Sequence, residues 1–395
     1  MRSALLLLPL LGCAAPEAGP PTETDPTPTV CPAVPDAWPE TPASLDEDVA
    51  AGMQAARVPG LSACLTSGDR VLWCRGYGWA NVETEVPATA DTPFLLASVS
   101  KLFTATAVLQ AHARGELDLD QDADALVPFS FQHPDAPGTP ITPRALLAHV
   151  GGIADNDAVM DTFYTTGQDP SVSLAALNEG YFDPDGQWYD ADRNFEPDGP
   201  EQVYSYANMG YAALGYLAEA ATGQDFVALT EARIFEPLGM DRTSWRVADL
   251  DLDEVAMPYR FRAGSYEPQG HYTFADFPNG GLRSTAQDVA CFLAAMAAGG
   301  GLGDAEILNT ALLEEAMTPA FPRLDDAQGL GWYREDMGES QLWIGHSGGE
   351  NGAATDVFMR QDGSLGLVLL MNGDWDREDA IYDIEDALVA FGDGL

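Results

Sequence analysis

The fold of this 395-residue chain is decided by the stretch Phe94-Leu95-Leu96-Ala97-Ser98-Val99-Ser100-Lys101-Leu102-Phe103-Thr104. Lys101 is the only lysine in the sequence, and it follows Ser98 by three residues. On a helix this spacing places the two side chains on the same face. An amine beside a hydroxyl could take its proton, which would activate the serine as a nucleophile.

The sequence around Lys101 favours a catalytic base over a solvated surface lysine. Leu102 and Phe103 follow it, and the segment before Ser98 is apolar and extended. Burial and the positive N-terminal end of a helix both disfavour a charged amine, so we expect a lowered pKa. Ser100 points to a different helix face and is the poorer candidate for the nucleophile.

Two further segments supply side chains that a Ser/Lys site needs. Tyr206 and Asn208 lie at the expected start of a helix, and a phenol near a cationic amine can shuttle a proton. The run Ile344-Gly345-His346-Ser347-Gly348-Gly349 ends a predicted strand, where small residues allow a substrate to approach the backbone closely. Each segment alone is more often structural, so a Ser/Lys site is predicted only from the three motifs together.

Together these motifs resemble the serine β-lactamase and penicillin-binding-protein superfamily, in particular class C β-lactamases, D-alanyl-D-alanine carboxypeptidases and related esterases. Ser98-Val99-Ser100-Lys101 matches the S-x-x-K motif, Tyr206-Ala207-Asn208 matches Y-x-N, and His346-Ser347-Gly348 matches the third triplet, usually K-T-G or H-x-G. The resemblance runs from about residue 45 to the C-terminus. It implies a β-lactamase/transpeptidase-like fold.

The resemblance implies a serine hydrolase that acts through an acyl-enzyme on an amide or ester. Ser98 would attack the carbonyl carbon, with Lys101 and Tyr206 as the proton-transfer pair. Asn208 would hold Lys101 and bind the substrate amide. Water would then release the acyl group.

The third motif would bind the substrate in this scheme. The backbone N–H groups of Ser98 and Gly349 would form the oxyanion hole, and His346, Ser347 and Gly348 would line the substrate site. A histidine in place of lysine weakens the positive charge there, because an unperturbed imidazole titrates near pH ~6.5. This favours D-Ala peptidase-like or esterase-like substrates over efficient β-lactam hydrolysis.

Two other interpretations compete with this function. Residues 345–349 also fit the G-x-S-x-G elbow of α/β-hydrolases, but no histidine follows His346 and the next segment is strand-like, so we reject it. The second interpretation is a sensor of the same fold that binds penicillin or muropeptide without turnover, and the sequence leaves it open. The intact Ser98, Lys101 and Tyr206 argue against such a dead site, but deacylation cannot be read from sequence.

Strand patterns at both ends of the chain and helical patterns between them predict the architecture. We expect an α/β protein of the α+β type, in which N- and C-terminal strands form one antiparallel sheet flanked by helices, with an inserted, mostly helical region. Helices are expected at Leu45–Arg57, Ser98–Gly115, Met209–Thr222, Thr285–Ala298 and Asp379–Phe391, and strands at Leu61–Thr66, Val71–Tyr77, Gln341–Gly345, Thr355–Arg360 and Leu365–Met371.

The expected hydrolase domain covers residues 43–395, with sheet parts at about 43–97 and 325–395 and the helical region at about 98–324. A catalytic cleft between the sheet and the helical region would be natural, because sites often form where two such parts meet.

The N-terminus has the features of an export signal. A short apolar run ends in Leu10-Leu11-Gly12-Cys13, which resembles a bacterial lipobox, so we expect residues 1–13 to be a signal peptide and Cys13 to be lipidated. Residues 14–42 are dense in Pro, Thr and acidic residues, as expected of an extended tether. The protein would be lipid-anchored in the bacterial cell envelope; a secreted or periplasmic soluble protein is the alternative.

The charge excludes several classes of partner. The sequence has 62 acidic against 18 basic residues, a formal net charge of -44. A surface so acidic disfavours nucleic acid and anionic lipid. We expect a small-molecule or peptide substrate, no nucleic acid, and membrane contact only through the lipid; no pattern predicts the oligomeric state.

The remaining cysteines suggest one disulfide and no metal site. Cys64 and Cys74 flank a tight turn and could form a disulfide across a hairpin in an oxidising compartment, with two separate thiols as the alternative. Cys31 and Cys291 cannot be paired from sequence. His and Cys show no zinc-site spacing, and the Asp-rich loop at residues 182–199 lacks EF-hand spacing, so we expect no metal and no cofactor.

Overall fold

The computed structural model describes residues 31, 33–35, 37–337 and 341–395. The expected signal peptide, the lipidation site Cys13 and most of the tether lie outside the described residues. Within the described ranges, no helix has both the length and the apolar character needed to cross a bilayer.

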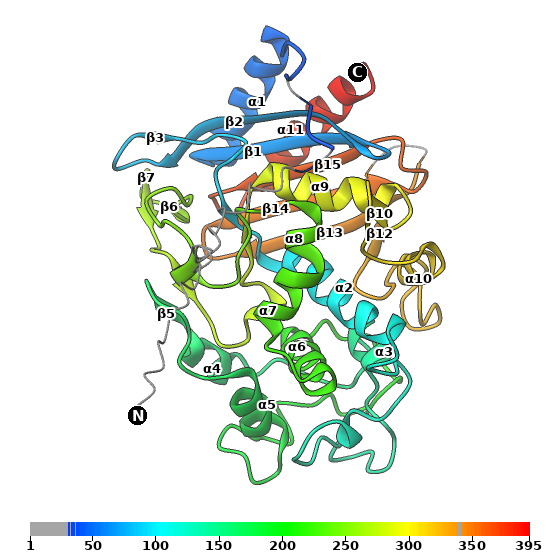
Figure 1. Ribbon diagram of the computed structural model, residues 1–395. Coiled ribbons are helices and arrows are strands. Elements are labelled where there is room, and N and C mark those ends of the chain that lie inside the picture. The colour runs from blue at the N-terminus through cyan, green and yellow to red at the C-terminus, as the bar shows by residue number, and fades with distance from the viewer. Residues whose placement is uncertain (1–30, 32, 36, 338–340) are drawn as a thin grey trace, which may run out of the picture.

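A seven-stranded antiparallel sheet forms one layer of the molecule, with the strand order β12-β13-β14-β15-β1-β2-β3 (Figure 1). Because β1 pairs with β15, the first and last strands of the chain meet inside the sheet, as the strand patterns at both termini predict. The strands are β1 (Gly60–Ser67), β2 (Arg70–Asn81), β3 (Val86–Pro87), β12 (Tyr333–Glu335), β13 (Trp343–Glu350), β14 (Ala353–Arg360) and β15 (Gly366–Met371).

Helices cover both faces of this sheet. The terminal helices α1 (Ala43–Ala56) and α11 (Glu378–Gly392) lie side by side on one face, and α9 (Ala286–Ala297) lies on the other (Figure 1). Ile381, Ile384 and Leu388 recur at the helical period on α11 and are fully buried against the sheet. A Cβ at Gly52 of α1 would come within 2.4 Å of Ile384, so a glycine lets the two helices approach closely.

In Figure 1 the helical region lies below the sheet, and its helix α2 (Ser100–Ala113), next to the sheet, is buried along almost its whole length. Helix α2 packs against α6 (Asn208–Thr222), so the first two motifs are brought together at the start of these two helices. The other helices are α3 (Pro143–Leu147), α4 (Asp157–Met160), α5 (Leu174–Phe182), α7 (Phe226–Thr230), α8 (Glu236–Leu238) and α10 (Thr310–Ala316).

The mostly helical region at residues 98–324 also contains short strands that the sequence patterns did not indicate. Four two-stranded ribbons draw most of their strands from this region, and strands this short give no alternating pattern that sequence can show. The ribbons are β4 (Phe94–Leu95) with β9 (Arg283–Ser284), β5 (Thr165–Thr166) with β8 (Tyr272–Thr273), β6 (Tyr259–Arg262) with β7 (Ser265–Pro268), and β10 (Gly301–Leu302) with β11 (Ala305–Glu306).

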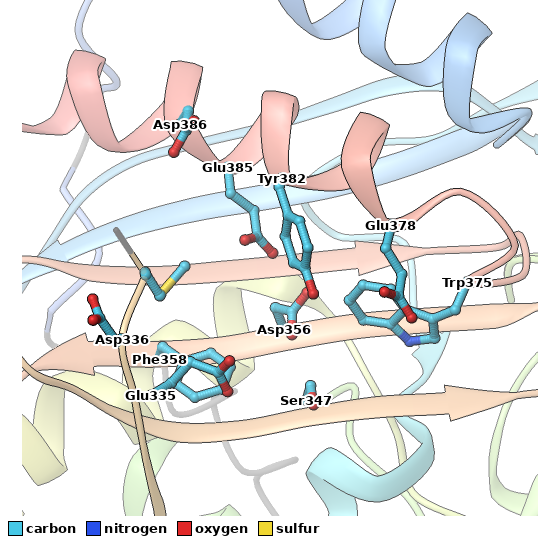
Figure 2. Close-up of a pocket in the computed structure, with 11 residues that line it drawn as sticks. Glu335, Asp336, Ser347, Asp356, Phe358, Trp375, Glu378, Tyr382, Glu385 and Asp386 are labelled. Carbon is cyan, nitrogen blue, oxygen red and sulfur yellow. The ribbon is translucent and has the colours of Figure 1, made fainter. Parts of the chain in front are cut away.

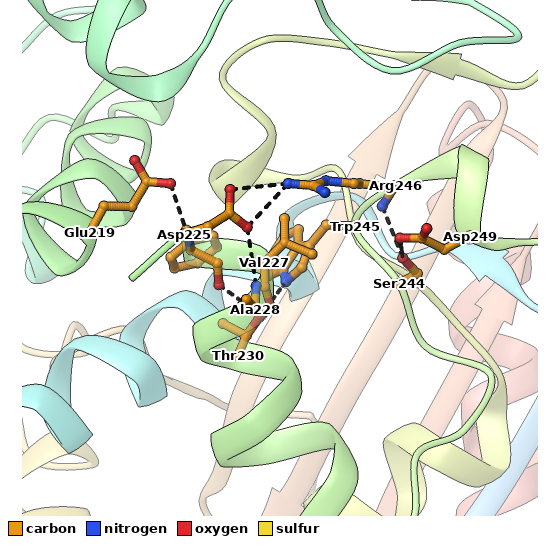
Figure 3. A network of polar contacts seen from close by, with 10 residues as sticks. Glu219, Asp225, Val227, Ala228, Thr230, Ser244, Trp245, Arg246 and Asp249 are labelled. Atoms are coloured by element: carbon orange, nitrogen blue, oxygen red, sulfur yellow. Dashed lines mark hydrogen bonds and ion pairs between the residues drawn. The ribbon is translucent and has the colours of Figure 1, made fainter. Parts of the chain in front are cut away.

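A polar network joins α7 to the segment at residues 244–249 (Figure 3). The Asp225 carboxylate accepts two hydrogen bonds from Arg246, at 3.1 and 3.0 Å, and the Trp245 indole donates to Thr230 Oγ1 at 2.9 Å. The exposed ion pair contributes little to stability, about 0–1 kcal/mol. The buried Trp245 indole therefore contributes more to the attachment of α7. Ser244, next to Trp245, pairs with Arg283 of β9, so this segment is also hydrogen-bonded to β9.

Two disulfides join parts of the described chain. Cys64 and Cys74 occupy directly paired positions on β1 and β2 and are bonded to each other. Cys31 is bonded to Cys291 of α9, across 260 residues of sequence. Because no local pattern links residues this far apart, only the folded chain reveals the second pairing.

Candidate active site

Ser98 lies in the 3₁₀ turn Ala97–Val99, directly before α2. Ala97 adopts a left-handed backbone with φ of 48°, which is strained for a residue with a side chain. Lys101 follows one turn later and donates a hydrogen bond from Nζ to Ser98 Oγ at 3.0 Å. The spacing that suggested the pair thus places its two reactive atoms in contact.

The Lys101 ammonium is fully buried and its three donors all have acceptors. Besides Ser98, it donates to Asn208 Oδ1 at 2.8 Å and to the Asn279 carbonyl at 2.7 Å. None of these acceptors is a carboxylate. Burial lowers the pKa of Lys101 to about 7, against the weaker attraction of Asp155, Asp276 and other acids nearby. A substantial neutral fraction at neutral pH makes this amine usable as a base.

Tyr206 lies over the amine on the cleft side. Lys101 Nζ is 4.8 Å from the centre of the Tyr206 ring, and that ring stacks on His149 at a centroid distance of 4.3 Å. The residue is 40 % exposed and lines the cleft, and desolvation by the surrounding protein raises its pKa despite a hydrogen-bonding interaction with Ser98. The phenol therefore keeps its proton at neutral pH.

Two residues that motif reasoning missed hold the Y-x-N segment in place. The Asp155 carboxylate accepts the backbone N–H groups of Asn208 and Met209, both at 2.9 Å, and so caps α6 from a distant loop. His149 Nδ1 accepts the N–H of Ala207 at 3.1 Å. Burial and the positive charge of the nearby lysine keep the pKa of His149 well below its usual value, so it is neutral and can accept.

The third motif lies within β13, which continues to Glu350 instead of ending at Gly345 as expected. It continues because Gly348 and Gly349 pair with Thr355 and Ala354 of β14. Small residues thus form part of a regular strand pair at the rim of the site.

His346 carries no positive charge in this site. It is only 3 % exposed, and burial together with the Lys101 charge lowers the pKa of His346 to about 3. Its Nδ1 donates to the Ser347 carbonyl, and the Ser347 hydroxyl is hydrogen-bonded to that of Tyr333. The third motif therefore offers polar but uncharged groups.

A cleft of about 550 Å³ joins the motifs. Ser98, Tyr206, His346, Ser347 and Gly349 all line it. Lys101 is fully buried behind Ser98, Asn208 is half-buried, and Gly348 packs against the Ser98 turn. Among the described residues, no group of three or more potential ligands could hold a metal ion.

A family model described as Beta-lactamase matches residues 45–391. The chain belongs to the β-lactamase family. Penicillin-binding protein 4* of Bacillus subtilis is 25% identical over 338 residues, which cover 79% of this chain and 67% of that protein. Protein flp of Staphylococcus aureus is 23% identical over 247 residues, or 62% of this chain, and the match spans only 47% of its length.

Solved structures show the same fold for this β-lactamase family member. A penicillin-binding protein homologue from Pyrococcus abyssi superposes with a TM-score of 0.73 at 24% identity, covering 88% of this chain and 77% of that one. D-amino acid amidase from Ochrobactrum anthropi gives 0.69 at 22% identity, covering 88% and 99%. The predicted family and fold class are thereby confirmed.

The cleft of this β-lactamase family member also contains residues that no motif indicated. Arg334 and Glu335 of β12 line it, together with Tyr333. Strand β12 is three residues long and carries no alternating pattern, so its side chains could be assigned to the cleft only once the strand was seen beside β13.

Gly348→Ala should lower kcat/KM of this β-lactamase family member about a hundredfold, because small displacements of reacting groups are costly. A Cβ at Gly348 would lie 2.6 Å from the Leu96 carbonyl oxygen and 2.8 Å from the Ser98 nitrogen, so strand and nucleophile turn must separate. Steady-state hydrolysis of a p-nitrophenyl ester measures the effect.

Gly210→Ala in α6 is the matched control for this substitution. Its Cβ would meet only side chains, at 3.7 and 3.8 Å, so activity should be retained and stability slightly raised. Equal activity of the Gly348→Ala and wild-type proteins would contradict the close packing of β13 on the Ser98 turn.

Proposed function

We propose that this protein is a serine hydrolase that forms an acyl-enzyme through Ser98 on an amide or ester. The contact of 3.0 Å between Lys101 Nζ and Ser98 Oγ carries this proposal, because the buried amine has a pKa of about 7. A neutral amine at this distance can accept the hydroxyl proton at neutral pH.

The groups around Ser98 supply each step of the reaction. Lys101 takes the proton of Ser98 Oγ, and the oxygen attacks the substrate carbonyl carbon. The backbone N–H groups of Ser98 and Gly349 stabilise the resulting oxyanion. Tyr206 passes a proton to the leaving oxygen or nitrogen and is reprotonated from the lysine. Water then attacks the acyl-enzyme by the same route in reverse and frees the acid.

Asn208 positions the base in this scheme. Its Oδ1 accepts from Lys101, and its backbone N–H is held by Asp155, so the amide is fixed at the start of α6. The amide nitrogen is left to hydrogen-bond the substrate.

The substrate that fits best has no carboxylate next to the scissile bond. His346 is neutral, so the third motif supplies no cation to pair with a carboxylate beside it. The Arg334 guanidinium also lines the cleft, but its Nε is already bonded to the Met317 carbonyl. The D-amino acid amidase of the same fold was solved with an amino-acid amide bound. We therefore expect neutral esters and amides to be hydrolysed faster than D-Ala-D-Ala peptides or a cephalosporin.

Turnover distinguishes this function from that of a sensor. Product release should be followed with p-nitrophenyl esters, nitrocefin and D-Ala-D-Ala peptides. The enzyme concentration should be high enough to detect one mole of product per mole of enzyme. Steady release over many equivalents of ester supports the hydrolase. A single burst equal to the enzyme concentration would instead assign the protein as a non-turnover penicillin- or muropeptide-binding sensor.

We also propose that processing before Cys13 removes residues 1–12, that Cys13 is lipidated, and that residues 14–42 link it to a domain that spans residues 43–395. Because Cys31 is buried and bonded to Cys291, only the part of this link before Cys31 can act as a free tether. The lipobox-like Leu10-Leu11-Gly12-Cys13 supports this, and so do the disulfides Cys31–Cys291 and Cys64–Cys74, which persist in oxidising compartments outside the cytosol.

Cys13→Ser should move the protein from the membrane fraction to the soluble fraction, because the proposed lipid attachment is lost. Globomycin, which blocks lipoprotein processing, should give an unprocessed precursor. Fractionation and immunoblotting measure both effects, and Cys31→Ser is a control that should stay in the membrane fraction. Unchanged partitioning of the Cys13→Ser protein would exclude a lipid anchor at this residue.

A further inference from the structure

A second cavity, of about 580 Å³, adjoins the catalytic cleft (Figure 2). It lies between α11 and the strands β12, β13 and β14, on the sheet face that α11 covers. Glu335, Asp336 and Ser347 line both the cavity and the cleft. These three shared residues place the cavity directly beside the cleft that contains Ser98.

The cavity is strongly acidic. No lysine or arginine is among its described lining residues, so its electrostatic potential favours a positively charged ligand. The carboxyl groups that line it are those of Glu335, Asp336, Asp356, Glu378, Glu385 and Asp386.

Two of these carboxyl groups are buried and incompletely paired. Asp356 of β14 is 3 % exposed and Glu385 of α11 is 4 % exposed, and they point toward each other across the cavity (Figure 2). Asp356 Oδ2 and Glu385 Oε1 have no hydrogen-bond partner. Burial raises the pKa of both carboxyl groups. The charge of Glu385 and its hydrogen bond with Asp356 raise the pKa of Asp356 further, so the two groups share a proton through their other oxygens. Buried acceptors without donors are costly, which points to a ligand that donates hydrogen bonds.

Aromatic side chains form another part of the wall. Phe358, Trp375 and Tyr382 line the same cavity, and aromatic faces attract organic cations. The Trp375 indole nitrogen donates to the Gly348 carbonyl at 2.7 Å, so this wall is fixed directly to the third motif. Carboxylates combined with aromatic rings suit an organic cation better than a metal ion, and the described residues contain no metal-binding cluster.

We propose that this cavity binds an ammonium or guanidinium group of the substrate whose ester or amide bond is cleaved at Ser98. The inference rests on the proposed hydrolase function for its link to catalysis, while cation binding itself does not require turnover. Donors of the bound cation satisfy the open oxygens of Asp356 and Glu385, and Trp375 and Tyr382 cover its apolar part. The same carboxyl groups repel a substrate with an anionic end.

Binding is tested with benzamidinium and benzamide, which have the same size but differ in charge. Calorimetry on the full protein should give about tenfold or tighter binding of benzamidinium, as expected for charged hydrogen bonds in a buried site. This preference should disappear in Asp356→Asn/Glu385→Gln. Glu267→Gln/Glu306→Gln removes two exposed carboxylates elsewhere, so it controls for net charge and should keep the preference.

Catalysis is tested with p-nitrophenyl 4-guanidinobenzoate and its neutral isostere p-nitrophenyl 4-ureidobenzoate. The wild-type protein should hydrolyse the cation with about tenfold higher kcat/KM, and Asp356→Asn/Glu385→Gln should reduce the ratio to about one while hydrolysis of the neutral ester persists. Equal binding of benzamidinium and benzamide by the wild-type protein would overturn the cation site, whether or not the variant folds. If the cation binds but no ester is hydrolysed, the hydrolase proposal fails and the cation site stands.

Discussion

Ser98→Ala should abolish hydrolysis of every ester and amide that the wild-type protein turns over, with kcat/KM lower by about four to six orders of magnitude. The alanine has no oxygen to attack the carbonyl, and Lys101 then has no proton to remove. Neighbouring groups still bind the substrate and polarise it, so a small residual rate above water remains. Progress curves with p-nitrophenyl esters, and mass spectrometry for the acyl-enzyme, measure the loss.

Ser100→Ala is the matched control because the two serines are two residues apart and only one reaches the cleft. Ser100 is fully buried and its hydroxyl accepts the Leu282 N–H at 3.1 Å, so its loss should lower Tm but leave the chemistry intact at moderate temperature. An active Ser98→Ala protein would refute the nucleophile assignment. Loss of acylation in a folded Ser100→Ala protein would mean that Ser100, and not Ser98, is the nucleophile.

The two serines also show how far sequence reasoning extends. The placement of Lys101 beside Ser98 could be predicted because helix periodicity alone fixes side chains three residues apart. The approach of Asn208 needed motif order as well, since it comes from a helix more than a hundred residues away. The Asn279 carbonyl could not be predicted, because backbone acceptors leave no mark in the side-chain sequence.

The charge of His346 could not be predicted for a related reason. Its residue type suggested a group that titrates near neutral pH, whereas burial and the adjacent lysine keep it neutral. The acidic cavity depends in the same way on packing, because Asp356 and Glu385 come from a strand and a helix whose facing sides become known only with the fold. Fold class follows from local periodicity, and site electrostatics follow from long-range packing.

Lys101→Met should lower the rate of acylation by about two to four orders of magnitude while the fold is kept, because methionine fills the same volume without a base. In the wild-type protein the rate should rise with pH through about 7, where Lys101 loses its proton. Methionine has no proton to lose, so the residual rate should lack this rise. Pre-steady-state ester cleavage between pH 5 and 9 measures both effects.

Lys101→Arg separates a base from a mere cation at this position. Arginine keeps a positive charge and can donate to the same acceptors, but its guanidinium does not lose a proton in this pH range. It should therefore be about as slow as Lys101→Met if the lysine is the base. Near-wild-type acylation by the arginine protein would mean that position 101 supplies charge only, and that another group deprotonates Ser98.

The pH dependence of stability gives an independent measure of the pKa of Lys101. The pKa of Lys101 is about 7 in the folded protein and 10.5 in the unfolded chain, so between these values the unfolded chain binds the extra proton. Its contribution to the free energy of unfolding therefore rises with pH across this window, by about 1.4 kcal/mol per unit at most. Urea unfolding at pH 7 and pH 9 should show this rise in the wild-type protein relative to Lys101→Met. Parallel pH dependences would mean that the lysine keeps its ordinary pKa, and a charged lysine could not then serve as the base for Ser98.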